Sequence, residues 1–307
     1  MTRAIRAHFV CALALTGVVA CRPDFTARPS TVGGHRMLAI IGSPPEVAPG
    51  EAASFRAVVA STGGTVMNPG VQWAFCTAPK SLVEPDVVSA VCLDDSAIVP
   101  FQDNSGTVPS DACARFGPDV ATTSAGQPPL RPRDADGTGG YYQPVRAAVS
   151  DLAPSFALER ISCGFQGATP DLAAAFRIQY HANTNPVLLS LTATSMGQAV
   201  DFAHLAPGKA VDLVAAWTAD SIEAFPVLDL PTQQIVSHTE AMSVSWYATS
   251  GTFDTDRTER AEGDNTPSSD NRWTPPTNAR DVHFWVVLRD SRGGVDVLVV
   301  DGTIRVP

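Results

Sequence analysis

The stretch APGKAVDLVAAW, residues 206–217, decides the fold class of this chain. A Pro-Gly turn comes first, and Val211, Leu213 and Ala215 then place an apolar side chain at every second position. The side chains of a β-strand alternate between two faces, so this spacing predicts a strand with one buried face. Pro and Gly are typical of turns, and we therefore expect a turn that opens this strand.

The same pattern occurs earlier in the chain, where APGEA at residues 48–52 precedes the alternating run 55–60. In each copy a second period-two strand follows, centred on Trp73 in the first and on Trp246 in the second. Both tryptophans are expected in the core because they lie in the middle of their strands. Each copy ends with a predicted hairpin, whose strands cover residues 142–149 and 156–163 in the first copy and 282–289 and 295–300 in the second.

These features resemble the bacterial immunoglobulin-like modules. In that family Pro-Gly begins the second strand, a tryptophan on the third strand packs between the sheets, and Asp-x-x-Gly-Gly turns the last hairpin, as at residues 290–294. Trp273, in Trp-Thr-Pro-Pro, resembles the family's tryptophan that packs before the sixth strand. The resemblance covers residues 36–165 and 186–307 and implies an all-β chain with two immunoglobulin-like β-sandwich domains.

Four segments are predicted along the chain. They are a cleaved signal peptide at 1–20, a lipidated N-terminus and flexible tether at 21–35, a first immunoglobulin-like domain at 36–185 and a second at 186–307. The first domain carries an insertion, about residues 77–140, that is dense in Pro, Gly, Asp and Ser. Loops of that length in compact domains usually carry a function or a cross-link.

Residues 164–185 fit two interpretations. Phe176, Ile178 and Tyr180 alternate like one more strand, whereas residues 171–176 form the best helix candidate in the chain. So short a helix leaves the all-β class unchanged.

The N-terminus has the organisation of an export signal. Arg3 and Arg6 precede an apolar stretch over 7–20, which is shorter than the roughly 20 residues that cross a bilayer as a helix. Val-Val-Ala-Cys, ending at Cys21, resembles the lipobox of bacterial lipoproteins, whose cysteine receives a diacylglyceryl group and becomes the new N-terminus. The resemblance implies a lipid-anchored protein of the cell envelope, with the periplasmic or surface face of the outer membrane as the expected location. An ordinary signal peptide cleaved near Ala20 is the alternative.

Export also determines how the cysteines are interpreted, because structural disulfides form in oxidising compartments. Cys11 falls in the signal peptide and Cys21 is the predicted lipid site, so four cysteines are left for the mature fold. The predicted disulfide framework consists of Cys76, Cys92, Cys113 and Cys163. Four cysteines allow three pairings, and the sequence does not choose among them. A structural zinc site is disfavoured because no Cys-x-x-Cys spacing occurs.

Charge and composition limit the possible partners. The formal net charge of -10 becomes -12 when Arg3 and Arg6 leave with the signal peptide. Nucleic acid is therefore not an expected partner, since its phosphates require clustered cations. Hydrophobic residues make up 44% of the chain and charged residues 17%, which is typical of a globular protein. The expected partners are a membrane, through the N-terminal lipid, and a protein or polysaccharide of unknown identity.

Catalytic motifs are missing from the sequence. It contains no G-x-S-x-G elbow, no H-E-x-x-H helix, no S-x-x-K and no glycine-rich phosphate loop. The mature histidines are scattered without a ligand spacing. Asp134-Ala135-Asp136-Gly137 and Asp254-x-Asp256 lack the later acid that a calcium loop requires, so solvated turns are favoured. We therefore predict no catalytic residue, no metal and no cofactor.

Exposed aromatic side chains are the remaining candidates for a binding site. Tyr141, Tyr142 and Trp217 lie near strand ends or turns, where sugar- and protein-binding surfaces place flat rings. The favoured function is a non-catalytic, membrane-anchored envelope lipoprotein whose immunoglobulin-like modules act as spacer and interaction surface. The alternatives are a carbohydrate-binding surface protein that uses these aromatics and a hydrolase with an unrecognised active site in the insertion. An enzyme is the less favoured class.

Overall fold

The computed structural model describes residues 28–80, 84, 87–118, 137–165 and 167–305. The predicted signal peptide, the lipobox with Cys21 and the aspartates of the candidate calcium loop at 134–137 lie outside the described residues. Strands dominate the described part, which also contains two α-helices and three short 3-10 helices. The all-β prediction is confirmed.

The first copy of the repeat forms a sandwich, called here the first sandwich. One sheet has the order β1-β3-β4, with β7 also paired to β3, and the other has the order β2-β9-β8-β5-β6. The separation of β1 and β3 from the β8–β9 hairpin is typical of immunoglobulin-like sandwiches. Its elements are β1 (Arg36–Ser43), β2 (Glu46–Val47), β3 (Ala52–Ser61), β4 (Gly64–Thr65), β5 (Gln72–Cys76), η1 (Ala90–Cys92), β6 (Ile98–Phe101), β7 (Ser105–Thr107), α1 (Ala112–Phe116), β8 (Gly140–Ala148) and β9 (Ser155–Ser162).

The second copy forms the second sandwich. Its sheets have the orders β11-β10-β12-β18-β16 and β17-β15-β19-β20, and β13 and β14 form a separate hairpin. Its elements are β10 (Leu188–Ser195), β11 (Gln198–Val200), η2 (Phe202–His204), β12 (Val211–Trp217), η3 (Ala219–Ser221), β13 (Ala224–Asp229), β14 (Gln234–Thr239), β15 (Met242–Ala248), β16 (Thr252–Phe253), β17 (Arg257–Arg260), β18 (Ser268–Thr274), β19 (Arg280–Asp290) and β20 (Val295–Ile304).

The repeat read from the sequence is present in three dimensions. The two Pro-Gly turns open β3 and β12, and the predicted hairpins are β8–β9 and β19–β20. Trp73 on β5 is 6% exposed, and Trp246 on β15 and Trp273 on β18 are 1% and 0% exposed. The core positions predicted for Trp73 and Trp246 are therefore confirmed.

Residues 170–179 form α2 (Pro170–Gln179) and not a strand. Thr169 caps the helix, since its side-chain oxygen accepts a hydrogen bond from the backbone N–H of Leu172 at 3.3 Å, and Pro170 fits the first turn, where no N–H is needed. Phe176 is buried whereas Ile178 is 86% exposed, so the two do not share a face. The strand suggested by their period-two spacing is wrong because the local N-cap signal is stronger.

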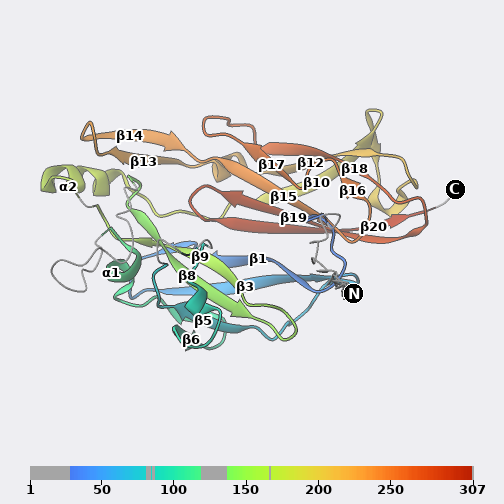
Figure 1. Ribbon diagram of the computed structural model, residues 1–307. Helices are drawn as coiled ribbons and strands as arrows, with labels where there is room; N and C mark the ends of the chain where they lie inside the picture. Colours follow the sequence, from blue (N-terminus) through green and yellow to red (C-terminus); the bar gives the residue numbers. More distant parts are fainter. Residues whose placement is uncertain (1–27, 81–83, 85–86, 119–136, 166, 306–307) are drawn as a thin grey trace, which may run out of the picture.

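The two sandwiches pack side by side (Figure 1), with β19 and β20 lying against β1 and β3. A separate apolar cluster fills this interface, and it includes Leu38, Val58, Trp285 and Val287. Between described residues, two hydrogen bonds cross it: Trp285 Nε1 donates to Thr65 Oγ1 at 2.9 Å, and Arg289 Nη2 donates to the carbonyl of Leu38 at 3.1 Å. The pair therefore buries a common core between the two individual ones.

The end of the predicted tether is docked on the second sandwich. Ser30 is 1% exposed and Val32 is fully buried, and their backbone groups exchange two 2.9 Å hydrogen bonds with Ala248. These bonds extend the edge of β15 beyond the end of its pairing with β17. The expectation of a flexible tether up to residue 35 is therefore wrong for residues 30–32, because Val32 joins the apolar interface.

Candidate binding groove

The strand β3 has an interruption along one of its edges. β7 pairs with it over Ala52–Ser54 and β4 pairs with it over Ala60–Ser61. Within the described ranges, no strand is paired with this edge between those two segments. Phe55 N donates to Asn104 O at 2.7 Å at one end of the gap, and Val66 N donates to Val59 O at 2.8 Å at the other.

The direction of the backbone groups in the gap follows from these two bonds. The N–H and C=O of one strand residue point to the same side, and alternate residues point to opposite sides. Because Phe55 and Val59 both point to this edge, Ala57 between them does so too. The N–H and C=O of Ala57 therefore face the gap, whereas those of Arg56 and Val58 point toward β1, their partner strand.

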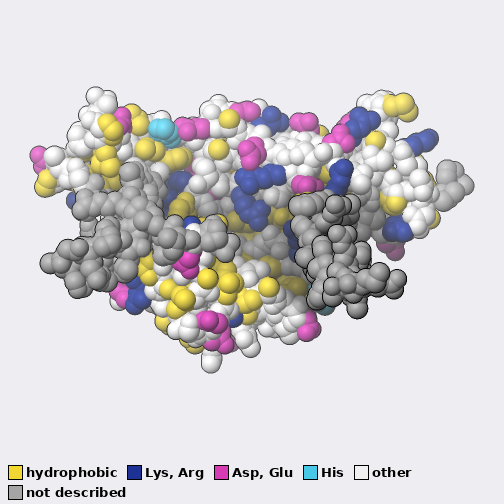
Figure 2. Space-filling view, viewed as in Figure 1, with side chains coloured by type: hydrophobic (Ala, Val, Ile, Leu, Met, Phe, Trp, Pro, Cys, Tyr) yellow, Lys and Arg dark blue, Asp and Glu magenta, His cyan; other side chains and the backbone are white. Residues whose placement is uncertain are grey.

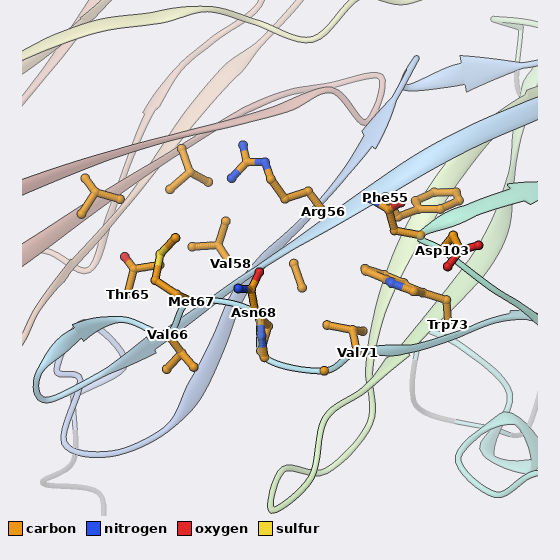
Figure 3. Close-up of a pocket in the computed structure, with 16 residues that line it drawn as sticks. Phe55, Arg56, Val58, Thr65, Val66, Met67, Asn68, Val71, Trp73 and Asp103 are labelled. Carbon is orange, nitrogen blue, oxygen red and sulfur yellow. The ribbon is translucent and has the colours of Figure 1, made fainter.

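A groove of about 780 Å³ follows the gap. That volume is within the range of ligand-binding pockets. Figure 3 shows Phe55, Arg56 and Val58 along β3, with Met67, Asn68 and Val71 on the facing loop and Trp73 beside them. The remaining wall comes from the second sandwich, whose edge strand β20 contributes Val297 and Val299.

The lining is largely apolar and partly open to solvent. Met67 is 79% exposed and Val299 is 41% exposed. Two charged side chains flank the groove: Arg56 is exposed on β3, and Asp103 lies in the turn before β7. Apolar walls with a few polar groups are typical of binding sites.

In the second sandwich, the strand edge that corresponds to this gap is paired with another strand. There β18 pairs with β12 continuously, from Val211 opposite Trp273 to Ala216 opposite Ser268. In the repeat, β12 corresponds to β3 and β18 to β7, but β7 covers only three residues of β3. The groove therefore occupies the place of the missing part of this strand.

The linker, residues 180–187, fixes the two sandwiches relative to each other. On the first sandwich Glu46 is 3% exposed and pairs with the buried Arg160 at 3.1 Å. The same carboxylate accepts hydrogen bonds from the hydroxyl of Tyr180 and, at 2.9 Å, from the backbone N–H of Asn183. A buried ion pair with these additional donors is well compensated for its loss of hydration.

The linker is bound to the second sandwich by the β19–β20 turn. Asp290 accepts hydrogen bonds from Asn183 Nδ2 at 3.3 Å and from the backbone N–H of Gly294 at 2.8 Å. Asn185 connects both sandwiches, since its Nδ2 donates to Gly42 O at 2.6 Å and its Oδ1 accepts from Val295 N at 2.8 Å. Two asparagines thus hold the linker in one position.

A buried arginine completes this junction. Arg292 is 1% exposed, and its Nε donates to Glu240 Oε1 at 2.8 Å. It also pairs with Glu223, and its guanidinium lies 4.8 Å from the centre of the Phe225 ring. Burial, together with the nearby Asp290 carboxylate, raises the pKa of Glu240 to about 7.

Glu159 on β9 is a second buried carboxyl near the junction. It is 3% exposed, and its Oε1 has no hydrogen-bond partner among the described residues. Burial and the neighbouring Glu46 carboxylate raise its pKa to about 8. Glu159 is therefore mostly a neutral acid at pH 7.

The predicted cysteine framework forms two disulfides, Cys76–Cys92 and Cys113–Cys163. The first joins β5 to η1 in the insertion, and the second joins α1 to the residue after β9. On the chain-entropy model, loops of 16 and 50 residues give about 3 and about 4 kcal/mol of stabilisation. Cys21, the predicted lipid site, is not among the described residues.

The aromatic binding candidates lie largely inside the protein. Tyr141 and Trp217 are each 2% exposed, and Tyr142 is half-buried beside the guanidinium of Arg160. Tyr141 and Tyr142 lie near the start of β8 and Trp217 ends β12, and the rings of Tyr141 and Trp217 pack inward into the two sandwich cores. Tyr141 and Trp217 are therefore corrected from surface to core positions. None of the five tryptophans is more than 6% exposed, so of the three aromatic candidates only Tyr142 is partly accessible to a carbohydrate.

The described part of the insertion extends the first sandwich. Its β6 pairs with β5 and its β7 with β3, and the turn between them lines the groove. Figure 2 shows apolar side chains gathered on the lower part of the molecule, over the first sandwich. Four apolar residues of the insertion are at least 44% exposed: Val87, Val91, Leu93 and Val99.

In the part of the chain that can be described, the histidine rings that form side-chain hydrogen bonds or ion pairs do so with carboxylates and not with a hydroxyl or thiol. The ring nitrogens of His204, His238 and His283 each pair with a carboxylate, Asp201, Glu262 and Asp301 respectively. Among the described residues, no group of three or more His, Cys, Asp or Glu side chains is placed to hold a metal ion. None of the helices in those ranges is long and apolar enough to span a bilayer.

Sequence reasoning does not find the groove. It assigns Trp73 to the core and gives no role to Arg56, Met67 or Val299. The signal that could have indicated it is the comparison of the two copies, since the insertion interrupts the first copy where the second has a continuous strand. Val299 lines the groove only because the two sandwiches pack together, and no local sequence pattern indicates that packing.

Comparisons with known proteins identify no family for this chain. No protein-family model matches the chain, and no curated protein matches it in sequence. Among solved structures, the Yersinia pseudotuberculosis adhesin InvE is 9% identical, with 87% of this chain and 58% of that chain covered and a TM-score of 0.26. A Salmonella alpha-2-macroglobulin mutant is 11% identical over 96% of this chain and 16% of that chain, with a TM-score of 0.22.

A structure of protocadherin gamma B7 extracellular cadherin domains is 9% identical, covering 87% of this chain and 49% of that chain, with a TM-score of 0.20. The chain thus spans less than two thirds of the length of each of these three proteins. At such TM-scores these similarities carry no functional information. The all-β architecture is established by the strands of the structure itself.

Proposed function

We propose that this chain is a non-catalytic lipoprotein of the bacterial cell envelope that presents a binding groove to a partner protein. The observation that carries the proposal is the apolar groove formed where the two sandwiches meet, beside an unpaired strand edge. Exposed apolar surface of this kind is uncommon on a protein that binds nothing.

The rigid pairing of the sandwiches supports an interaction role more than a spacer role. An apolar interface and a hydrogen-bonded linker hold the pair together, so the chain is shorter than two modules joined end to end. Binding to a preformed groove costs less conformational entropy than binding to hinged modules. We propose the domain division at 36–185 and 186–307, with the linker at the boundary.

The envelope location is proposed from the N-terminal sequence and is consistent with the two disulfides, which form in oxidising compartments. We propose that Cys21 carries the lipid that anchors the chain to the membrane. Because each buried methylene contributes about 0.8 kcal/mol, several acyl chains on one residue anchor a protein firmly.

Palmitate labelling tests the anchor. We expect the wild-type protein to incorporate labelled palmitate and to fractionate with membranes, whereas Cys21→Ala does neither. Cys11→Ala, in the signal peptide, is the matched control and should be labelled like the wild type. Equal labelling of Cys21→Ala, or none of the wild type, would contradict the proposed anchor.

Photo-crosslinking in the producing cells tests the groove as an interaction surface. A photoreactive residue replacing Met67 should give a defined crosslink to an envelope protein, because this position lines the groove and is 79% exposed. The same residue replacing Met196, which is 95% exposed in the turn between β10 and β11, is the control. Identical crosslinks from both positions, or none from Met67, would contradict a specific site in the groove.

A further inference from the structure

We infer that the groove binds an extended segment of the partner protein, which adds a strand to the free edge of β3 between β4 and β7. This inference rests on the proposed function and specifies its partner. The segment would occupy the place that β18 fills on β12 in the second sandwich. Its chemistry is that of an extended peptide with alternating apolar side chains and one acidic residue.

The backbone of β3 supplies the first part of the recognition. The N–H and C=O of Ala57 face the groove and are placed to bond to an added antiparallel strand. An unpaired edge of this kind is a template for another chain, and strand addition is an established mode of peptide recognition. The gap between Phe55, whose N–H is bonded to Asn104, and Val59, whose C=O is bonded to Val66, is about 13 Å long, at roughly 3.3 Å per residue.

The side walls supply the second part. A strand added to β3 alternates its side chains between two faces. On one face lie Trp73 and Val71 of the first sandwich, and on the other lie Val297 and Val299 of the second. Val58 and Val297 also belong to the apolar cluster between the sandwiches, so an added strand continues an interface that is already present.

Charge supplies the third part. Arg56 is exposed at the groove and forms no ion pair with another described residue. A guanidinium favours a carboxylate, which it can bind through two parallel hydrogen bonds. Asp103, at the β7 end of the groove, disfavours a second acidic residue there. The bound segment is therefore expected to carry an acidic residue opposite Arg56 and none at the end near Asp103.

A displayed library of random octapeptides tests this inference, with the unlipidated chain 22–307 as the target. The expected result is a set of peptides with alternating apolar residues and one acidic residue. Ala57→Pro removes one N–H donor from the groove and should weaken the binding of a selected synthetic peptide at least tenfold. Val299→Lys, at a position 41% exposed, should also weaken peptide binding. This second variant tests the groove even if β3 does not tolerate proline.

Charge reversal provides the matched control. Arg56→Glu should weaken the binding of peptides that contain the acidic residue at least tenfold. It should weaken the binding of peptides in which that residue is replaced by Gln to a smaller extent. Arg177→Glu makes the same change at an exposed arginine of α2 outside the groove and should leave affinity within twofold of the wild type.

Three outcomes overturn the inference. In the first, no peptide is selected. In the second, the selected peptides bind Ala57→Pro and Val299→Lys as tightly as the wild type. In the third, the chain forms a dimer that Ala57→Pro abolishes, so that a second copy of the chain is the occupant. None of these results bears on palmitate labelling of Cys21. Peptides that bind outside the groove would contradict strand addition to β3 but would not contradict the proposed interaction role.

Discussion

At the scale of single residues, buried carboxyl groups make the stability of this protein depend on pH. Glu159 and Glu240 are at most 3% exposed, and their pKa values are raised to about 8 and about 7. In the unfolded chain both titrate near 4.5. The folded state therefore binds more protons than the unfolded state between about pH 4.5 and pH 8, and stability must fall as the pH rises through that window.

We expect the free energy of unfolding to be a few kcal/mol higher at pH 5 than at pH 8, since each pH unit in the window contributes up to about 1.4 kcal/mol per group. Glu159→Gln should be more stable than the wild type at pH 8 and show a flatter dependence. Urea unfolding at several pH values measures this. Glu259→Gln, which removes an exposed carboxylate paired with Arg257, should leave the pH dependence unchanged. A wild type more stable at pH 8 than at pH 5 would contradict the buried, neutral Glu159.

Residue by residue, the sequence predicts burial better than it predicts exposure. Trp73 and Trp246 lie in the middle of alternating strands, and the prediction that they are buried is confirmed. Trp217 ends a strand, and its position along the chain says nothing about which way its ring turns. In the structure it joins the core of the second sandwich, because a large aromatic side chain gains more from burial than from exposure.

At the scale of elements, the difference between β3 and β12 is the most informative feature. Both begin after a Pro-Gly turn and both carry an alanine at the equivalent position, Ala57 and Ala215. Ala215 faces Ser269 of β18, and the N–H of Trp217, two residues on, donates to the carbonyl of Pro267, the residue before β18, at 3.0 Å. By alternation the N–H of Ala215 also bonds to β18, whereas that of Ala57 faces the groove.

Proline substitution distinguishes these two edges. Ala57→Pro should cost about 1 kcal/mol or less, because proline is tolerated where the strand N–H is not part of a ladder. Ala215→Pro should cost at least about 2 to 3 kcal/mol, because it breaks a ladder hydrogen bond and leaves a buried carbonyl without its donor. Thermal or urea unfolding of the two variants compares them directly. An equal loss of stability would show that the edge of β3 is already paired.

The elements that can be predicted from sequence are those with strong local signals. The Pro-Gly turns and the two C-terminal hairpins are placed correctly because turn residues and period-two strands reinforce each other. β7 has only three residues, too few for any periodicity, and it lies within an insertion rich in turn residues. The groove depends on that short strand, so no local pattern predicts it.

At the scale of the whole molecule, the packing of the two sandwiches comes from residues far apart in sequence. Leu38 on β1 and Val58 on β3 meet Trp285 and Val287 on β19. The alternation within each strand does not say what covers its faces. Strands such as β19 are apolar on both faces: residues Phe284 to Leu288 are all at most 1% exposed. That unbroken run is the sequence signal for a sheet covered on both sides.

The linker explains why the pair is fixed. Glu46, Asn183 and Asp290 form a chain of buried polar contacts from one sandwich to the other, and Asn185 forms a second. Breaking such a network leaves buried groups without partners, each costing about 1 to 3 kcal/mol. Hinge motion at the linker is therefore costly, and the walls of the groove keep their separation.

Small-angle X-ray scattering of the unlipidated chain tests most directly whether the sandwiches form one body. A single compact body of this length has a radius of gyration of about 19 Å, and we expect a value close to this, independent of salt. Two sandwiches, each with a radius of gyration of roughly 14 Å and joined end to end with centres about 40 Å apart, would give an overall radius of gyration of about 25 Å. A value near 25 Å would contradict the side-by-side packing and with it the groove between the sandwiches.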